Sequence, residues 1–151
     1  MASNINIWSW NARSLVCHHD QLKELLTRTE PLPDIICIQE TFLSSKLSFK
    51  VPGYVVERRD RLEKGGGVAI CIKEGQPYKV LASPESHEIM LIDVITGSSH
   101  IVVANVYIPP GKNSPGSDET YEVLKELGSK HDKILFEEIS MHITIYGVAQ
   151  K

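Results

Sequence analysis

Cysteine is scarce in this 151-residue sequence, which contains only Cys17, Cys37 and Cys71. An odd number of cysteines without CxxC spacing excludes a disulfide framework and a zinc knuckle, and it is typical of a reducing compartment. Long apolar runs are also lacking: no stretch approaches the roughly 18 apolar residues of a membrane span, and the amino terminus has no basic segment before an apolar one. We therefore expect a soluble protein that is intracellular, nuclear or cytoplasmic, not secreted, with no membrane partner.

An excess of positive charge is absent as well. The 16 Lys and Arg residues are outnumbered by 19 Asp and Glu residues, which gives a net charge of -3. This balance excludes a protein that coats nucleic acid through its bulk charge, although a local basic patch can still hold a few phosphates. With 42% hydrophobic and 23% charged residues, the composition is that of one ordinary globular domain.

The segment Pro33–Thr41, with the sequence PDIICIQET, organises the rest of the chain. Its apolar run Ile35–Ile38 is too short for a helix and rich in β-branched side chains, which predicts a buried strand that ends abruptly at Gln39 and Glu40. A carboxylate at the carboxyl end of a buried strand lies where open α/β sheets place their ligands. The alternative is that Glu40 only marks the point where the strand leaves the core.

A second strand precedes this one in the chain. Residues Ile5–Trp10 show strand periodicity and stop at Asn11, and leucines at helical spacing follow Ser14. A strand, a helix and a second strand form a βαβ unit, whose right-handed crossover makes the strands parallel, with both carboxyl ends at one edge. We therefore expect Asn11 and Glu40 to be neighbours.

Further elements follow along the chain. Apolar and alternating patterns predict strands at Val68–Ile72, Glu88–Ile95, His100–Tyr107 and Ile134–Phe136, the last broken by Glu137 and Glu138, with a final alternating segment at Met141–Val148. Ser117 is expected to cap a helix that runs to about Lys130, and Thr96–Ser99 to form the loop of a hairpin. The glycines Gly65–Gly67 indicate positive φ or a close backbone approach, and not a phosphate-binding P-loop.

Four short motifs occur in a fixed order along the sequence. They are WNARSL at Trp10–Leu15, DIICIQET at Asp34–Thr41, RRDR with GGGVAI at Arg58–Ile70, and NVYIPP at Asn105–Pro110. Each motif is weak alone, but their ordered spacing closely resembles the endonuclease/exonuclease/phosphatase superfamily. The nearest likeness is to the apurinic-type endonuclease domain at the amino end of non-LTR (LINE-type) retrotransposon polyproteins, and it covers roughly Asn4–Phe136.

The resemblance implies an α/β fold, namely part of a DNase I-like, four-layer α/β/β/α sandwich, and a Mg²⁺-dependent phosphodiester hydrolase that acts on DNA. Carried over by position, Glu40 looks like the metal-ligating carboxylate, Asn11 like its companion in metal binding and catalysis, and Tyr107 like the tyrosine that faces the scissile phosphate. One carboxylate and one amide oxygen suit Mg²⁺, with Mn²⁺ as a substitute, because water and substrate phosphate complete the shell. Apart from the resemblance, Asn11 is equally well a turn residue and Tyr107 an ordinary strand-end tyrosine.

A basic cluster lies in the first half of the third motif segment. Its four cations are candidates for contacting nucleic-acid phosphates despite the acidic total charge. The alternative is a solvated loop whose charge is partly neutralised by Glu57, Asp60 and Glu63. The four candidates are Arg58, Arg59, Arg61 and Lys64.

The sequence departs from the family pattern after Phe136. In the family this strand continues into a Gly-Asp-x-Asn motif, and a Ser-Asp-His motif closes the domain, whereas neither motif occurs here. We therefore expect residues 1–136 to be the amino-terminal part of such a domain and residues 137–151 a divergent tail. Groups that activate water and stabilise the transition state are then missing, which predicts metal binding without activity of the chain alone.

Two rival functions and one structural expectation remain open from the sequence. A non-catalytic module that binds protein or nucleic acid is the main alternative, and a phosphoesterase acting on lipid or nucleotide phosphates is a weaker one. If most strands belong to the first half of the sandwich, its inner face stays uncovered. Self-association through that exposed apolar face, aggregation or stabilisation by a partner is then expected, unless Met141–Val148 pairs as a substitute strand and covers part of the face.

Overall fold

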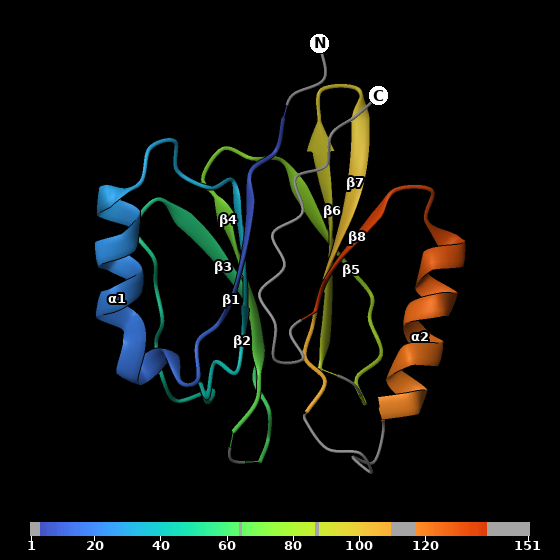
Figure 1. Cartoon of the computed structure of the whole chain (residues 1–151), viewed down its shortest axis with the longest axis horizontal. Coiled ribbons are helices and arrows are strands. Elements are labelled where there is room, and N and C mark those ends of the chain that lie inside the picture. Colours follow the sequence, from blue (N-terminus) through green and yellow to red (C-terminus); the bar gives the residue numbers. More distant parts are fainter. Residues whose placement is uncertain (1–3, 64, 87, 110–116, 139–151) are drawn as a thin grey trace.

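The computed structural model describes residues 4–63, 65–86, 88–109 and 117–138, which form two four-stranded sheets and two helices (Figure 1). The sheets lie face to face in the centre of the molecule, with one helix on the outer side of each. From left to right in Figure 1 the layers are α1, the sheet of β1–β4, the sheet of β5–β8, and α2. The expected α/β/β/α layering is thus confirmed.

The first sheet contains the βαβ unit that the sequence predicts. Its strand order is β1-β2-β4-β3, where β1 spans Ile7–Asn11, β2 Ile35–Gln39, β4 Val68–Lys73 and β3 Tyr54–Arg59. Strands β1 and β2 are parallel and are connected through α1, Leu15–Arg28, while β4 runs antiparallel to both β2 and β3. The carboxyl ends of β1 and β2 therefore meet at one edge, as expected.

The second sheet has the strand order β5-β6-β7-β8, formed by Tyr78–Leu81, Ile89–Thr96, Ser99–Val106 and Ile134–Glu138. Strands β6 and β7 form the predicted hairpin, although Thr96 pairs with Ser99, so its loop has two residues and not four. Helix α2, Ser117–Lys130, leads into β8, which runs parallel to β7. The predicted end of α2 at Lys130 is confirmed, while Ser117 is its first residue and not the cap before it.

Two local expectations differ from the structure, and a third is not tested by it. Strands β3 and β5 were not expected, because neither segment has a long apolar or alternating run. The break at Glu137 is wrong, since Asn105 pairs with Glu137 and Val106 with Glu138, which extends β8. The segment expected at Met141–Val148 lies outside the described residues.

The main core lies between the two sheets. Alternate residues of each strand point into it, which gives nine buried side chains: Ile35, Cys37, Val68, Ile70, Ile72, Met90, Ile92, Val94 and Val103. The first five come from β2 and β4 and the last four from β6 and β7, so each sheet covers the other. The expectation of an uncovered inner face is therefore wrong, and self-association through it has no support. The error arose from assigning β6 and β7 to the same sheet as β2.

Each helix buries a second core on the outer face of its sheet. Leu15 and Leu22 of α1 pack on the intervening residues of β2 and β4, including Ile36 and Ile38. Leu124 of α2 packs in the same way on the outer face of β6 and β7. Because β2 is buried on both faces, its run of apolar residues is continuous and not alternating. Within the described residues, neither helix is long and apolar enough to cross a bilayer.

Candidate functional site

Polar side chains replace apolar ones at one end of the inner core. On β1, Ile5 and Ile7 belong to this core, so the same face continues through Ser9 to Asn11. On β2 the same alternation leads from Ile35 and Cys37 to Gln39. On β7 it leads from Ile101 and Val103 to Asn105 and then Tyr107. The polar cluster is therefore the end of a sheet interface, built by two-residue periodicity on three strands.

Glu40 follows β2 directly at this end. Asn11 Nδ2 donates a hydrogen bond to Glu40 Oε1 at 2.9 Å, which confirms that the two residues are neighbours. Asn11 Oδ1 accepts a bond from the Arg13 amide at 3.1 Å, so both ends of the Asn11 side chain are fixed. The carboxylate of Glu40 is thus oriented by a residue from the adjacent parallel strand.

The Tyr107 hydroxyl reaches the same carboxylate from the opposite sheet. Burial, its hydrogen bond to Glu40 and the negative charges of Glu40 and Glu88 together raise the pKa of Tyr107 to about 12, against a smaller lowering by Arg61. The Tyr107 amide also donates to the Glu88 carbonyl at 3.0 Å. The phenol is therefore a neutral hydrogen-bond donor at physiological pH.

A buried amide pair lies directly behind Glu40 and Tyr107. Gln39 Nε2 donates to Asn105 Oδ1 at 2.6 Å, and both residues are 0% exposed. Asn105 Nδ2 donates to two carbonyls of the facing sheet, Ile38 O at 3.0 Å and Ala69 O at 2.8 Å. Because Gln39 precedes Glu40 and Asn105 is two residues before Tyr107, this bridge joins the strands that carry the two site residues.

Backbone strain is concentrated at this edge. The four non-glycine residues with positive φ among the described residues are Arg13, Ser14, Glu40 and Phe42. Two of them follow Asn11, and the other two are Glu40 and the residue two positions after it. Backbone bonds from Ser14 N to Glu40 O and from Leu15 N to Thr41 O hold the two segments together at 2.8 and 2.9 Å. Such clustering is typical of functional sites.

The three consecutive glycines pack against this edge. They show both features expected from the sequence, namely positive φ and a close approach of the backbone to neighbouring groups. Gly65, Gly66 and Gly67 all have positive φ. A Cβ on Gly66 would overlap Glu88 Oε1, and one on Gly67 would lie 2.5 Å from Thr41 Oγ1. The Gly67 amide donates to Glu88 Oε1. The loop thereby joins the segment after Glu40 to the Glu88 carboxylate.

The basic residues expected to contact phosphates lie in different surroundings. Arg58 donates to Ser44 O at 2.9 Å and pairs with Asp60 at 3.0 Å. Arg59 donates to two carbonyls near the start of β6, Pro84 O and Ile89 O, and so joins the two sheets.

Arg61, in contrast, is at the candidate site. Its side chain is 38% exposed and lies 3.9 Å from Glu88 Oε2, and its charge acts on Tyr107. Of the three described arginines of the basic cluster it is therefore the one best placed to meet a phosphate. Lys64 lies outside the described residues, so its expected role stays a prediction.

The donor set fits a weakly held Mg²⁺ and not a closed metal cage. Among the described residues no group of three or more His, Cys, Asp or Glu side chains converges. Mg²⁺ keeps several waters and needs one or two carboxylates, and Glu40 provides one at the sheet edge. Asn11 turns its NH₂ group toward Glu40, so it orients that carboxylate. Direct ligation by Asn11 Oδ1 stays a prediction.

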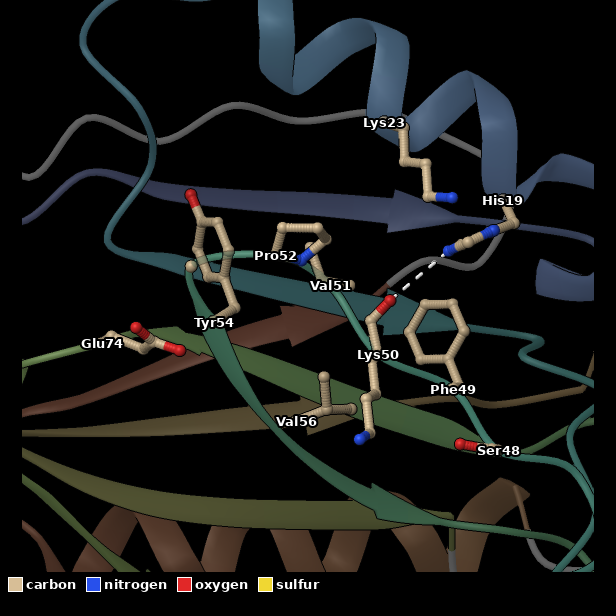
Figure 2. Close-up of a pocket in the computed structure, with 11 residues that line it drawn as sticks. His19, Lys23, Ser48, Phe49, Lys50, Val51, Pro52, Tyr54, Val56 and Glu74 are labelled. Atoms are coloured by element: carbon tan, nitrogen blue, oxygen red, sulfur yellow. Dashed lines mark hydrogen bonds between the residues drawn. The ribbon is translucent and has the colours of Figure 1, made fainter.

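A separate groove of about 790 Å³ lies between α1 and the segment that precedes β3 (Figure 2). His19 and Lys23 of α1 line one side, and Phe49, Lys50 and Tyr54 line the other. His19 Nε2 and the Lys50 carbonyl lie 3.4 Å apart across it. Since Asn11, Glu40 and Tyr107 do not line this groove, it is distinct from the candidate site.

Sequence reasoning missed three contributors to the site. The sequence places Glu88 only at the start of a strand, Gln39 at the end of one and Asn105 in a motif, and it indicates no partner for any of them. Asn105 carries a signal that could have shown its role: it continues the inward-facing series of Ile101 and Val103, so a polar side chain on that face needs a buried partner. Glu88 has no such signal, because only the fold brings it to the glycine loop.

Solved structures with the same fold include several nucleases. The chain aligns with the 3'-5' exonuclease NExo from Neisseria meningitidis at 22% identity and a TM-score of 0.60, covering 89% of this chain and 57% of that one. The AP endonuclease LMAP from Leishmania major aligns at 16% identity and a TM-score of 0.65, covering 89% of this chain and 54% of that one. The endonuclease domain of TRAS1, a telomere-specific non-LTR retrotransposon, aligns at 18% identity and a TM-score of 0.62, covering 89% of this chain and 57% of that one.

These likenesses establish the fold, and the chain spans little more than half the length of the structures it matches. None of the curated proteins compared with the chain matches it. The sequence pattern of one family, however, matches residues 8–131 and thus most of the chain, including Asn11, Glu40 and Tyr107. The chain therefore belongs to the endonuclease/exonuclease/phosphatase family.

Proposed function

We propose that this chain provides the metal-binding part of a Mg²⁺-dependent nuclease domain related to retrotransposon DNA endonucleases, with a DNA phosphodiester as its ligand. The observation that carries the proposal is the convergence on one carboxylate. Asn11 from one sheet and Tyr107 from the other both hydrogen-bond to Glu40. Arg61 is the adjacent cation.

Each residue has a role that follows from its chemistry. Glu40 supplies the hard, anionic oxygen that Mg²⁺ prefers, and the hydrogen bond from Asn11 holds this oxygen in place. The bound ion would neutralise charge on a phosphate oxygen. Tyr107 keeps its proton, so its hydroxyl can donate to a phosphate oxygen brought to Glu40. Arg61 adds positive charge beside an otherwise acidic site.

The residues present hold and orient a phosphodiester but provide no complete catalyst. Hydrolysis needs a base or an oriented water in line with the leaving group, and the Gly-Asp-x-Asn and Ser-Asp-His groups that would serve the family do not occur in this sequence. We therefore propose that the 151-residue chain binds metal and DNA without cleaving it. A partner chain that supplies those groups would restore the reaction.

Metal binding is tested by titration with Mn²⁺, followed through the water proton relaxation rate. Wild type is expected to bind weakly, because one carboxylate leaves most of the coordination shell to water. Glu40→Ala should abolish this binding, and Glu85→Ala, which removes another carboxylate on the surface, should not change it. Equal binding by wild type and Glu40→Ala would refute the proposed metal site.

Cleavage is tested with supercoiled plasmid in Mg²⁺ and, as a control, in EDTA. We expect no nicking above background by the pure chain. Magnesium-dependent nicking that disappears in Glu40→Ala would contradict the proposal of an incomplete catalyst while supporting the metal role of Glu40. If the chain binds DNA equally well in Mg²⁺ and in EDTA, the non-catalytic binding module replaces the nuclease-derived site as the better description.

A further inference from the structure

Phe42 is a bulky side chain in a backbone conformation that such residues rarely adopt. Its φ is 52°, and its side chain belongs to the exposed large hydrophobics of the protein with 42% exposure. It lies two residues after Glu40, which also has positive φ. A left-handed conformation is unfavourable for a residue with a Cβ. Neither the backbone conformation nor burial of the ring in the core therefore accounts for a phenylalanine at this position.

The conformation is imposed by hydrogen bonds on two sides. Thr41 is buried, its carbonyl accepts from Leu15 N, and its amide donates to Gly67 O at 3.2 Å. The Phe42 amide donates to Gly66 O at 2.9 Å. The segment after Glu40 is thus fixed between the start of α1 and the glycine loop, and Phe42 is directed outward from that fixed backbone.

The glycine loop also sets where the ring lies. A Cβ placed on Gly65 would meet Phe42 Cε1 at 3.7 Å, an ordinary contact distance, so the ring rests on the side of this glycine. The next glycine, Gly66, is packed against Arg61 and Glu88. One short loop therefore connects the exposed ring with Arg61 and with the acidic groups around Tyr107.

We propose that Phe42 is a stacking platform for an unpaired nucleobase next to the phosphate held at Glu40, so that the site prefers single-stranded or unpaired DNA over duplex. This inference rests on the proposed function, because the phosphate defines which base is adjacent. A flat apolar ring and an exposed arginine, which lie against neighbouring glycines of one loop, match the two chemical parts of a nucleotide. In a duplex the bases are stacked on each other and are not available to the ring.

The test compares binding of a fluorescein-labelled single-stranded oligonucleotide with binding of its duplex, by fluorescence anisotropy in Mg²⁺. Wild type is expected to prefer the single strand. Phe42→Ala should bind the single strand about tenfold more weakly and the duplex unchanged. Phe42→Trp should keep the preference. Tyr121→Ala removes an aromatic side chain of similar exposure, 44%, on α2, and should behave as wild type.

Phe42→Gly separates a binding role from a structural one. Glycine adopts positive φ without strain, so this variant is expected to melt at a temperature equal to or higher than that of wild type, yet to lose the preference for the single strand. A direct readout is 2-aminopurine in the single strand, whose fluorescence should be quenched on binding to wild type and less quenched with Phe42→Leu.

Several outcomes would overturn the proposal. One is that Phe42→Gly binds both oligonucleotides as tightly as wild type does. Another is that Phe42→Ala weakens binding of the single strand and of the duplex equally. The third is that wild type binds neither oligonucleotide. Failure of this proposal is distinguishable from failure of the metal site. Mn²⁺ binding that depends on Glu40 is measured without DNA, and a change at Phe42 should leave it intact.

Discussion

Replacement of Asn105 is expected to destabilise the protein far more than its small size suggests. The side chain is 0% exposed and bonds to three groups, namely Gln39 Nε2 and the carbonyls of Ile38 and Ala69. Asn105→Ala leaves these groups in a buried environment at a cost of about 1 kcal/mol or more each. With the lost packing, we expect a decrease of about 3–5 kcal/mol in the free energy of unfolding, out of a total of about 5–15 kcal/mol.

Urea unfolding followed by tryptophan fluorescence measures this effect. With a slope of about 2 kcal/mol per molar urea, the midpoint should fall by about 2 M. Val103→Ala provides the matched control, because Val103 is on the same face of β7, is 0% exposed and has a side chain that cannot form hydrogen bonds. Its expected cost is about 2 kcal/mol from packing alone.

A double-mutant cycle isolates the bond between the two sheets. Gln39→Leu and Asn105→Leu are measured singly and together, and the pair is expected to show a coupling energy of about 1–3 kcal/mol. The double variant should be more stable than the sum of the single changes predicts, because it leaves fewer unpaired amide groups. A coupling energy within about 0.5 kcal/mol of zero would refute the reasoning.

Two further predictions concern other contacts between the sheets. Burial and the hydrogen bond with Glu57 raise the pKa of Tyr78 from 10.0 to about 12. The contribution of Tyr78 to stability should thus be complete below pH 10 and disappear as the pH rises through about 12. Urea midpoints measured against pH should show this loss in wild type and a smaller loss in Tyr78→Phe. Gly66→Ala should lower the melting temperature more than Gly75→Ala. Both glycines have positive φ, but a Cβ added at Gly66 would meet Glu88 and Arg61, whereas one added at Gly75 would meet no atom of the described residues within 4 Å beyond its own chain neighbours. Equal shifts in melting temperature would show that backbone strain alone matters.

The sequence was sufficient for those parts of the fold that depend on local periodicity. The parallel pairing of β1 and β2 followed from the βαβ pattern, and this pairing alone placed Asn11 beside Glu40. Edge strands β3 and β5 were missed because their exposed residues give no clear alternation, as the exposed Val55 and Val80 show.

The assignment of strands to sheets could not be predicted in the same way. Strands β2 and β6 have similar apolar runs, and a run of apolar residues shows that a strand is buried without showing which sheet contains it. For the site, the motifs identified Glu40 and Tyr107, but Glu88 lies 48 positions from Glu40 in the sequence and is brought to the site by its contacts with the glycine loop and with Tyr107. Contacts of this kind depend on loop geometry, which periodicity does not encode.

Because Glu40 lies on one sheet and Tyr107 on the other, the site is complete only when the two sheets are packed together. A ligand that contacts both residues binds only when the sheets are docked, so by mass action it must stabilise the docked state over every opened one. At a concentration one hundred times its dissociation constant, such a ligand adds about 2.7 kcal/mol to the free energy of unfolding. Thermal shift in the presence of oligonucleotide and Mg²⁺ would therefore register occupancy of the site without any assay of cleavage.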